Sequence, residues 1–201
     1  MTRNVDIIFL NGTSSAGKST VAHALRENLD GVWLHVTLDA FFRLLPPDFM
    51  QDPTWGDRLD WDEVLIGFHA MVAQIPRTGY PVILDHVCTS ARWRDQCVDI
   101  FRDYRVLYVG VSCPLAELRR REEARGDRNP GIAEEHLAKY KAAGPFDVEV
   151  DTHAATPEEC AKQIIAAMAE PTAFQQIRAE LERKRAEQSA GGDAEGRASH
   201  L

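Results

Sequence analysis

Short apolar runs alternate along the chain with stretches of helical periodicity. Five such runs, each bounded by polar or turn residues, predict β-strands, and apolar residues spaced three and four apart between them predict helices. Strands that alternate with helices indicate an α/β fold, in which a parallel sheet has helices on both faces. The strands are expected at residues 5–10, 32–36, 81–85, 105–112 and 147–151.

Several of the predicted helices have clear starting signals. Asp60 and Thr156 each stand three residues before a glutamate, which is the spacing of a capping box. Pro114 suits the first position of a helix, where its missing N–H costs little. The helices are expected at residues 20–29, 60–75, 90–102, 113–128, 132–141 and 156–168.

Two stretches break this alternation. Residues 40–59 have no period and mix aromatic residues with prolines, and such long irregular connections are usually functional. Past Pro171, a narrow apolar stripe predicts a C-terminal helix over 171–188, and a Gly/Ala-rich polar composition predicts a disordered tail over 189–201. We therefore expect one domain over 1–170. The C-terminal helix either packs on this domain, the commoner outcome, or joins two chains as a homodimer.

The turn between the first predicted strand and the first helix carries the strongest chemical signal. The glycines of this turn allow a conformation in which consecutive N–H groups face an anion, and the following helix directs its positive end to the same place. Lys18 is expected to reach the outer phosphates of a nucleotide, and the Ser19 hydroxyl to ligate Mg²⁺. A chance Gly/Ser-rich turn is the alternative, but the strand and helix on either side favour nucleotide binding. The turn reads Gly12-Thr13-Ser14-Ser15-Ala16-Gly17-Lys18-Ser19, followed by Thr20, and matches the phosphate-binding loop pattern.

Composition narrows the possible partners. The 201 residues are 44% hydrophobic and 27% charged, which are ordinary values for one globular domain. A formal net charge of −8 gives no support for binding a nucleic-acid backbone. The first apolar run is too short for a signal peptide or a membrane span, and the 4 cysteines form no close pair, which indicates reduced thiols. We therefore expect a cytoplasmic protein that binds neither membranes nor nucleic acid.

One aspartate follows a predicted strand and another closes one, at the sheet edge where α/β proteins bind ligands. Asp85 comes directly after four apolar residues. It is expected to orient Mg²⁺ or contact the substrate, or else to cap a helix. Asp39 could cap the segment that follows it, or act as a general base that takes the proton from an acceptor hydroxyl, and the two roles are compatible.

The acceptor of the phosphoryl group is expected to bind beside Asp39. The residues after Asp39 suggest a pocket with an apolar wall, and the irregular stretch supplies a tryptophan as a further aromatic contact. The 7 histidines show no metal-ligand spacing, and one of them adjoins Asp85. The expected acceptor pocket consists of Asp39, Phe41, Phe42, Arg43, Trp55, Asp85 and His86.

Arginines form the third cluster. Arg121, Arg125 and Arg128 are four and three residues apart, so on a helix they share one face. Guanidinium groups held together repel one another unless an anion lies among them, and arginine suits bidentate phosphate contact. One interpretation is a lid over residues 119–131 that closes on the nucleotide and stabilises the transferring phosphoryl group. The other is a solvated basic face, with Glu122 and its acidic neighbours as counter-charges.

Together these motifs resemble the chloramphenicol phosphotransferase-like family of P-loop kinases. The loop alone is common to many kinases, but its form from Asn11 to Ser19, together with the Arg-Gly-Asp-Arg run at 125–128, is more particular. The resemblance extends over about residues 7–168, most of the chain. The matching segments are 10–19, 38–39, 82–85, 121–128 and 148–152.

The resemblance implies an ATP-dependent O-phosphotransferase with a five-stranded parallel sheet of order 2-3-1-4-5. It also implies that Asp39 acts as the base on a primary hydroxyl of the acceptor, and that the lid arginines contact the nucleotide. Thr152 and His153 are implied to lie beside the adenine. The chain departs from the family on the acceptor side, where His86 takes the place of a second aspartate after the third strand.

The sequence as a whole therefore predicts a kinase that moves the γ-phosphoryl group of ATP, with Mg²⁺, to a hydroxyl of a small molecule. An antibiotic or related natural product is the favoured acceptor class. A metabolic kinase for a nucleoside, sugar acid or shikimate-like acceptor is a rival, and its anionic acceptors usually need arginines such as Arg43 and Arg58. A regulatory nucleotide-binding module is another, although the chain has no Asn-Lys-x-Asp run of the GTPase kind. The expected catalytic residues are Asp39, Lys18, Arg125 and Arg128.

Overall fold

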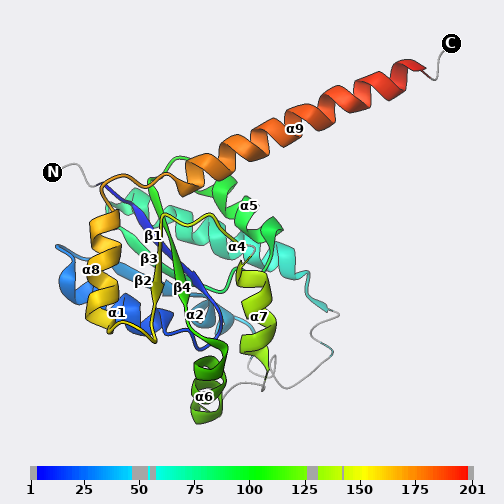
Figure 1. Cartoon of the computed structure of the whole chain (residues 1–201). Coiled ribbons are helices and arrows are strands. Elements are labelled where there is room, and N and C mark those ends of the chain that lie inside the picture. The colour runs from blue at the N-terminus through cyan, green and yellow to red at the C-terminus, as the bar shows by residue number, and fades with distance from the viewer. Residues whose placement is uncertain (1–3, 47–53, 55–57, 126–130, 142, 199–201) are drawn as a thin grey trace.

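Five parallel strands form one sheet at the centre of the molecule (Figure 1). The structure, a computed structural model, describes residues 4–46, 54, 58–125, 131–141 and 143–198. The strands are β1 (Ile7–Gly12), β2 (Leu34–Thr37), β3 (Val82–His86), β4 (Val106–Ser112) and β5 (Val148–Asp151). They lie in the order β2-β3-β1-β4-β5, which confirms the sheet that the resemblance implies. Every residue of β1 and β3 is buried, and the apolar runs at residues 7–10 and 82–84 predict this burial.

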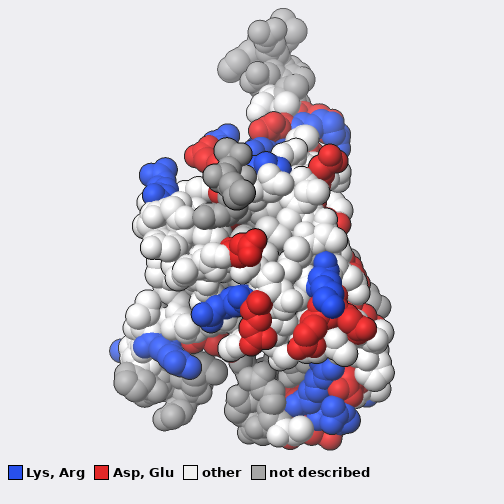
Figure 2. Space-filling view, turned by 90° about the vertical axis from the view of Figure 1, so that its left-hand side faces the viewer, with Lys and Arg blue, Asp and Glu red and all other residues white. Residues whose placement is uncertain are grey.

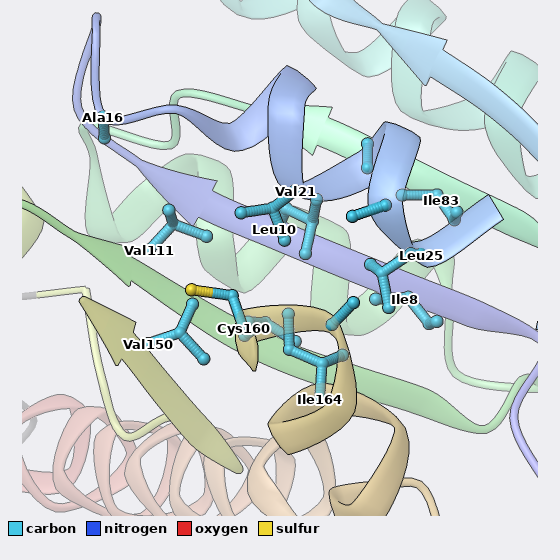
Figure 3. Close-up of a cluster of buried hydrophobic side chains, with 14 of the residues drawn as sticks. Ile8, Leu10, Ala16, Val21, Leu25, Ile83, Val111, Val150, Cys160 and Ile164 are labelled. Atoms are coloured by element: carbon cyan, nitrogen blue, oxygen red, sulfur yellow. The ribbon is translucent and has the colours of Figure 1, made fainter. Parts of the chain in front are cut away.

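One face of the sheet is covered by α1 (Lys18–Asn28) and α8 (Pro157–Ala167). Figure 3 shows how side chains of both helices pack on this face. Leu10 and Ile83 of the central strands lie in the same cluster as Val21 of α1 and Ile164 of α8, all of them almost fully buried. This face holds α1 in place, and α1 begins at the end of the phosphate-binding loop.

The opposite face is covered by α4 (Trp61–Gln74), α5 (Ala91–Ile100) and the start of α9 (Ala173–Ala198). Its core is aromatic: Phe9 of β1 lies edge-on to Phe101 and Phe174, with ring centroids 6.5 and 5.9 Å apart. The remaining helical elements are α2 (Leu38–Phe42), η1 (Pro76–Thr78), α6 (Leu115–Arg125) and α7 (Ile132–Lys141).

Helix ends follow the starting signals in the sequence. Asp60 accepts hydrogen bonds from the first N–H groups of α4, and Thr156 forms a complete capping box with Glu159 at the start of α8. The short helix α2 was not expected. Thr37 is its N-cap and accepts a hydrogen bond from the Ala40 N–H at 2.9 Å. The alternative in which Asp39 caps this segment is therefore wrong.

The C-terminal helix α9 projects away from the domain (Figure 1). Its first turns pack through Phe174 and Ile177, and farther along Arg185 pairs with Asp99 at 2.6 Å. The helix continues to Ala198, so residues 189–198, which were expected to be disordered, are helical. Once the first turns are fixed, each further residue adds one backbone hydrogen bond, so a helix can extend beyond its packed portion. No helix in the described ranges is both long and apolar enough to cross a membrane.

Charged side chains of both signs are mixed on the surface. On the face shown in Figure 2, lysine and arginine side chains lie among aspartates and glutamates. Exposed ion pairs such as Arg119 with Glu134 and Lys139 with Glu135, both at 2.6 Å, show the same mixing. Pairs of this kind add little to stability, so the fold depends mainly on its two apolar layers.

Gly12 ends β1 where no side chain can fit. A Cβ atom at this position would collide with the main-chain carbonyl oxygen of Val111 in β4. We expect Gly12→Ala to lower the free energy of unfolding by about 1–3 kcal/mol, because a buried backbone carbonyl cannot move aside cheaply. Urea unfolding measures the change. Gly67→Ala in α4 is the control, because nothing lies within 4 Å of its Cβ position. Equal stabilities of the two variants would contradict the prediction.

Candidate functional site

The loop between β1 and α1 leaves the start of a helix uncapped. Gly17 is the N-cap residue of α1 with a left-handed φ of 88°, and no side chain bonds to the helix start. Ser15 also has a positive φ, of 62°, which is unusual for a residue with a side chain. Uncapped N–H groups and the positive end of the helix dipole together form a site for an anion.

Two side-chain hydroxyl groups of the loop lack a hydrogen-bond partner among the described residues. Thr13 Oγ1 and Ser15 Oγ are buried and have no hydrogen-bond partner within the described part of the chain. Buried hydroxyls are normally paired, so such atoms mark a place for a ligand. Lys18 Nζ donates to the Thr13 carbonyl at 2.8 Å, which holds its ammonium group at the loop. The loop thus presents a cation and unpaired hydroxyls to one region, as a polyphosphate requires.

A cavity of about 480 Å³ opens on one side of the loop, a size usual for small-molecule sites. Residues from α1, α6 and the segment after β5 form its walls. The sequence predicts the loop, Arg121 and Thr152 in this wall, but it does not predict Val21, Arg120, Ala124, Ala155 or Pro157. The lining residues are Ser15, Gly17, Thr20, Val21, Arg120, Arg121, Ala124, Thr152, Ala155 and Pro157.

Arg121 and Thr152 tie helix α6 to the loop. Arg121 donates to the Thr152 hydroxyl and to the Thr152 carbonyl, both at 3.0 Å. The Thr152 hydroxyl in turn donates to the Ala16 carbonyl at 2.7 Å. On its other side Arg121 donates to Glu117, whose pKa falls to about 2 because Arg120 and Arg121 both bond to it. Arg121 is therefore fixed beside the loop and forms part of the cavity wall.

A second cavity, of about 170 Å³, lies on the other side of the loop. Eight of the predicted residues line it, and among them it brings together Lys18, Ser19, Asp39 and Asp85. They come from α1, α2 and β3, which meet at the carboxyl edge of the sheet. Sequence analysis missed Leu38 and Val87 in this cavity, although their position just past β2 and β3 was a usable signal.

Asp85 is the most constrained carboxylate of this cavity. Ser19 Oγ donates to Asp85 Oδ2 at 2.6 Å, and Lys18 Nζ lies 3.9 Å from Oδ1. Burial alone would raise the pKa of Asp85, but nearby His35, Lys18 and Ser19 outweigh that effect and hold the pKa below its ordinary value. The Asp85 carboxylate is therefore charged and directed at Ser19.

His86 does not line this cavity, contrary to the prediction for the acceptor pocket. Successive residues of a strand point to opposite faces, so Asp85 faces α1 and His86 faces α4. The His86 ring is fully buried, and its Nε2 atom lies 2.9 Å from His69 Nε2. Burial lowers the pKa of His69 to about 4 and that of His86 to about 3, so both rings are neutral and share one hydrogen bond. His86 is a core residue.

The other expected acceptor residues follow Asp39 in the chain but are not among the residues that line the second cavity. Phe41 packs on Phe68 of α4 with ring centroids 5.0 Å apart, and Phe42 lies edge-on to Trp61 at 5.7 Å. Arg43 is exposed. The aromatic rings are half-buried, so they contribute both to the core and to the surface around Asp39.

Three expected site residues are not placed by the structure, and one is placed elsewhere. Trp55 and Arg128 lie outside the described residues, and Arg125 ends α6 without a described side chain. His153 is exposed, and its N–H bonds to Asp151 at 2.8 Å. It is not among the residues that line the larger cavity, which Thr152 lines instead.

This fold and loop define the class of P-loop kinases. Among solved structures, the APS kinase CysC of Mycobacterium tuberculosis aligns with a TM-score of 0.64 and 18% identity, over 85% of this chain and all of that one. The tunicamycin resistance protein of Deinococcus radiodurans aligns with a TM-score of 0.60 and 23% identity, over 81% of this chain and 94% of that one. A gluconokinase of Sinorhizobium meliloti aligns with a TM-score of 0.59 and 19% identity, over 91% of this chain and 99% of that one. At these identities the likeness shows the fold.

The chain belongs to the chloramphenicol phosphotransferase-like protein family, whose sequence profile matches residues 5–169. A protein provisionally named O-phosphotransferase in two strains of Mycobacterium tuberculosis is 32% identical over 197 residues, which cover 86% of this chain and 87% of the relative. Family and fold together identify the chain as a phosphotransferase of the kinase type with a hydroxyl group as acceptor.

Proposed function

We propose that the protein transfers the γ-phosphoryl group of ATP to a hydroxyl of a small, uncharged molecule of the antibiotic or natural-product kind. One observation carries this proposal: Asp39 lies in the same small cavity as Lys18 and Ser19. A carboxylate beside the phosphate site can accept the proton of the attacking hydroxyl. The hydroxyl oxygen then bonds to the γ-phosphorus, the bond to the ADP oxygen breaks, and the proton passes to Asp39.

The residues present fit Mg²⁺, although its use is a proposal. Magnesium prefers oxygen ligands and keeps several waters, and Ser19 Oγ and Asp85 Oδ2 lie 2.6 Å apart in the small cavity. Ser19 would ligate the ion, and Asp85 would hold the Ser19 hydroxyl or one of the metal's waters. When bound, the ion neutralises charge on the phosphates.

The charges of the small cavity support an uncharged acceptor over a sugar acid or shikimate-like one. Within the described part of the chain, its lining holds two carboxylates, Asp39 and Asp85, and one cation, Lys18. Lys18 already bonds to the loop carbonyl of Thr13 and is proposed to bind the phosphates. An acceptor with its own carboxylate or phosphate would approach two like charges here, whereas a neutral hydroxyl compound would not.

A phosphotransfer screen with γ-labelled ATP tests the proposal. The panel contains chloramphenicol and neutral nucleoside antibiotics as uncharged compounds, aminoglycosides as cationic comparisons, and shikimate and gluconate as anionic comparisons. We expect labelled product with at least one uncharged compound and none with the two acids. Tight ATP binding without transfer to any compound would favour a regulatory module, and transfer to an acid would favour a metabolic kinase.

Thr152 offers a test of the nucleotide side that needs no acceptor. We expect Thr152→Val to weaken ATP binding roughly tenfold, because valine has the same shape but loses the bonds to Ala16 and Arg121, each worth about 1 kcal/mol. Isothermal titration calorimetry measures the affinity. Thr78→Val is the control, since it removes a similar hydroxyl bond from an exposed turn. If Thr152→Val bound ATP with the affinity of the parent, the hydrogen bonds from Thr152 to Ala16 and Arg121 would not shape the nucleotide site.

A further inference from the structure

His35 of β2 points at Asp85 without forming a hydrogen bond. It pairs with Ile83 in the sheet, so its side chain emerges on the same face as Asp85, close to the α1 side. Its Nε2 atom lies 3.8 Å from Asp85 Oδ2. That distance exceeds an N–H···O bond and is too short to admit a water molecule between the two atoms. Nε2 is buried and has no hydrogen-bond partner in the described residues.

The surroundings hold the His35 ring in this orientation. His23 of α1 lies edge-on to it, with ring centroids 5.8 Å apart and planes at 85°. The carboxylate that it faces already accepts from Ser19 at 2.6 Å and lies 3.9 Å from Lys18 Nζ. A carboxylate oxygen has two acceptor sites, so Asp85 Oδ2 can accept from Ser19 and from a second donor at once. A small shift of Asp85 would bring His35 within bonding distance.

We propose that His35 is a positioning residue for the proposed magnesium site at Ser19 and Asp85. The Nε2–H group of His35 bonds to Asp85 Oδ2 when Mg²⁺ and nucleotide bind. The inference rests on the proposed function, because it requires a metal–nucleotide complex at Ser19 and Asp85. Groups that bond to metal-site carboxylates fix their orientation, and their loss typically weakens metal binding 10–100-fold. His35 acts through Asp85 and contacts neither the nucleotide nor the acceptor.

Two substitutions separate the hydrogen bond from the shape of the ring. His35→Phe keeps a planar ring without a donor, and His35→Gln keeps an N–H donor at a similar distance from the backbone. ATP binding is measured by calorimetry with Mg²⁺ and again with EDTA. For His35→Phe we expect binding in Mg²⁺ to weaken roughly tenfold or more, and binding in EDTA to stay within about twofold of the parent. His35→Gln should recover most of the loss.

The control is His23→Phe, which keeps the ring beside His35 and should bind as the parent does under both conditions. Unchanged Mg²⁺-dependent binding in His35→Phe overturns the inference. Equal losses of ATP affinity in Mg²⁺ and in EDTA also overturn the inference, because they would show that His35 has a general structural role. Thermal unfolding of each variant checks that structural role directly. A parent that binds ATP no better with Mg²⁺ than with EDTA overturns the proposed metal site, and the role of His35 with it.

Discussion

Asp39→Asn is expected to lower kcat for phosphotransfer by roughly 10²–10⁴-fold, because it removes the general base. Asparagine has nearly the same size, so the cavity keeps its shape. Asp39 is exposed at the start of α2 and is not the cap of this helix, a role that Thr37 fills. The substitution should therefore leave the fold intact. Steady-state kinetics with the acceptor found in the screen measures the effect.

Binding data separate the base from other roles of Asp39. ATP affinity should stay near that of the parent, because the phosphate contacts come from the loop and from Lys18. Asp103→Asn is a matched control, since Asp103 is an exposed aspartate in the turn after α5. A kcat within a few-fold of the parent would show that Asp39 is not the base. The regulatory interpretation would then gain weight.

The fold could be predicted because its signals are local. Each strand is built on a short apolar run, which polar residues interrupt in β2 and β5, and each capping residue stands at a fixed spacing from the helix that it starts. The strand order is not local, and periodicity alone did not supply it; it came from the family resemblance. The same local signals placed Lys18, Ser19, Asp39 and Asp85 at or past the strand ends, and the structure brings all four to one cavity.

Predictions failed where the outcome depended on which way a side chain faces. Asp85 and His86 are neighbours, but strand alternation sends one to the cavity and the other to the core. Glu122 was considered a counter-charge among arginines. It is only 5% exposed, and it accepts hydrogen bonds from the N–H groups of Gly131 and Ala133 at 2.9 and 3.0 Å. A charge run in the sequence does not reveal that one of its members accepts hydrogen bonds from the N–H groups at the start of α7.

His35 and Thr152 show a second limit of prediction from the sequence. The resemblance implied a place for Thr152 beside the nucleotide but not its bond to Ala16 of the loop, and no motif includes His35, which lies in an edge strand but faces Asp85. Both contacts join segments far apart in the chain, so they depend on the strand order. Residues that support a site from a neighbouring strand become visible only once the sheet is assembled.

Lys18→Met is the second substitution for which we expect a large effect. It should lower kcat by roughly 10²–10³-fold, because the ammonium group stabilises charge that develops on the transferring phosphoryl group. Methionine has a similar length and no charge. The substitution also removes a cation that lies 3.9 Å from Asp85, so the pKa of that buried carboxyl group should rise. ATP binding should therefore weaken as well, since both the phosphate contact and the metal side of the cavity are affected. Kinetics and calorimetry together measure the two effects.

Two further variants show whether charge alone accounts for the effect. Lys162→Met removes an exposed lysine of α8 and should behave as the parent does. Lys18→Arg keeps the positive charge, but its planar fork cannot repeat the single bond from Nζ to the Thr13 carbonyl within a buried loop. We expect it to remain impaired, because the position of the ammonium group matters as much as its charge. Full activity in Lys18→Arg would mean that a cation near the loop suffices, and parental activity in Lys18→Met would remove Lys18 from the catalytic site.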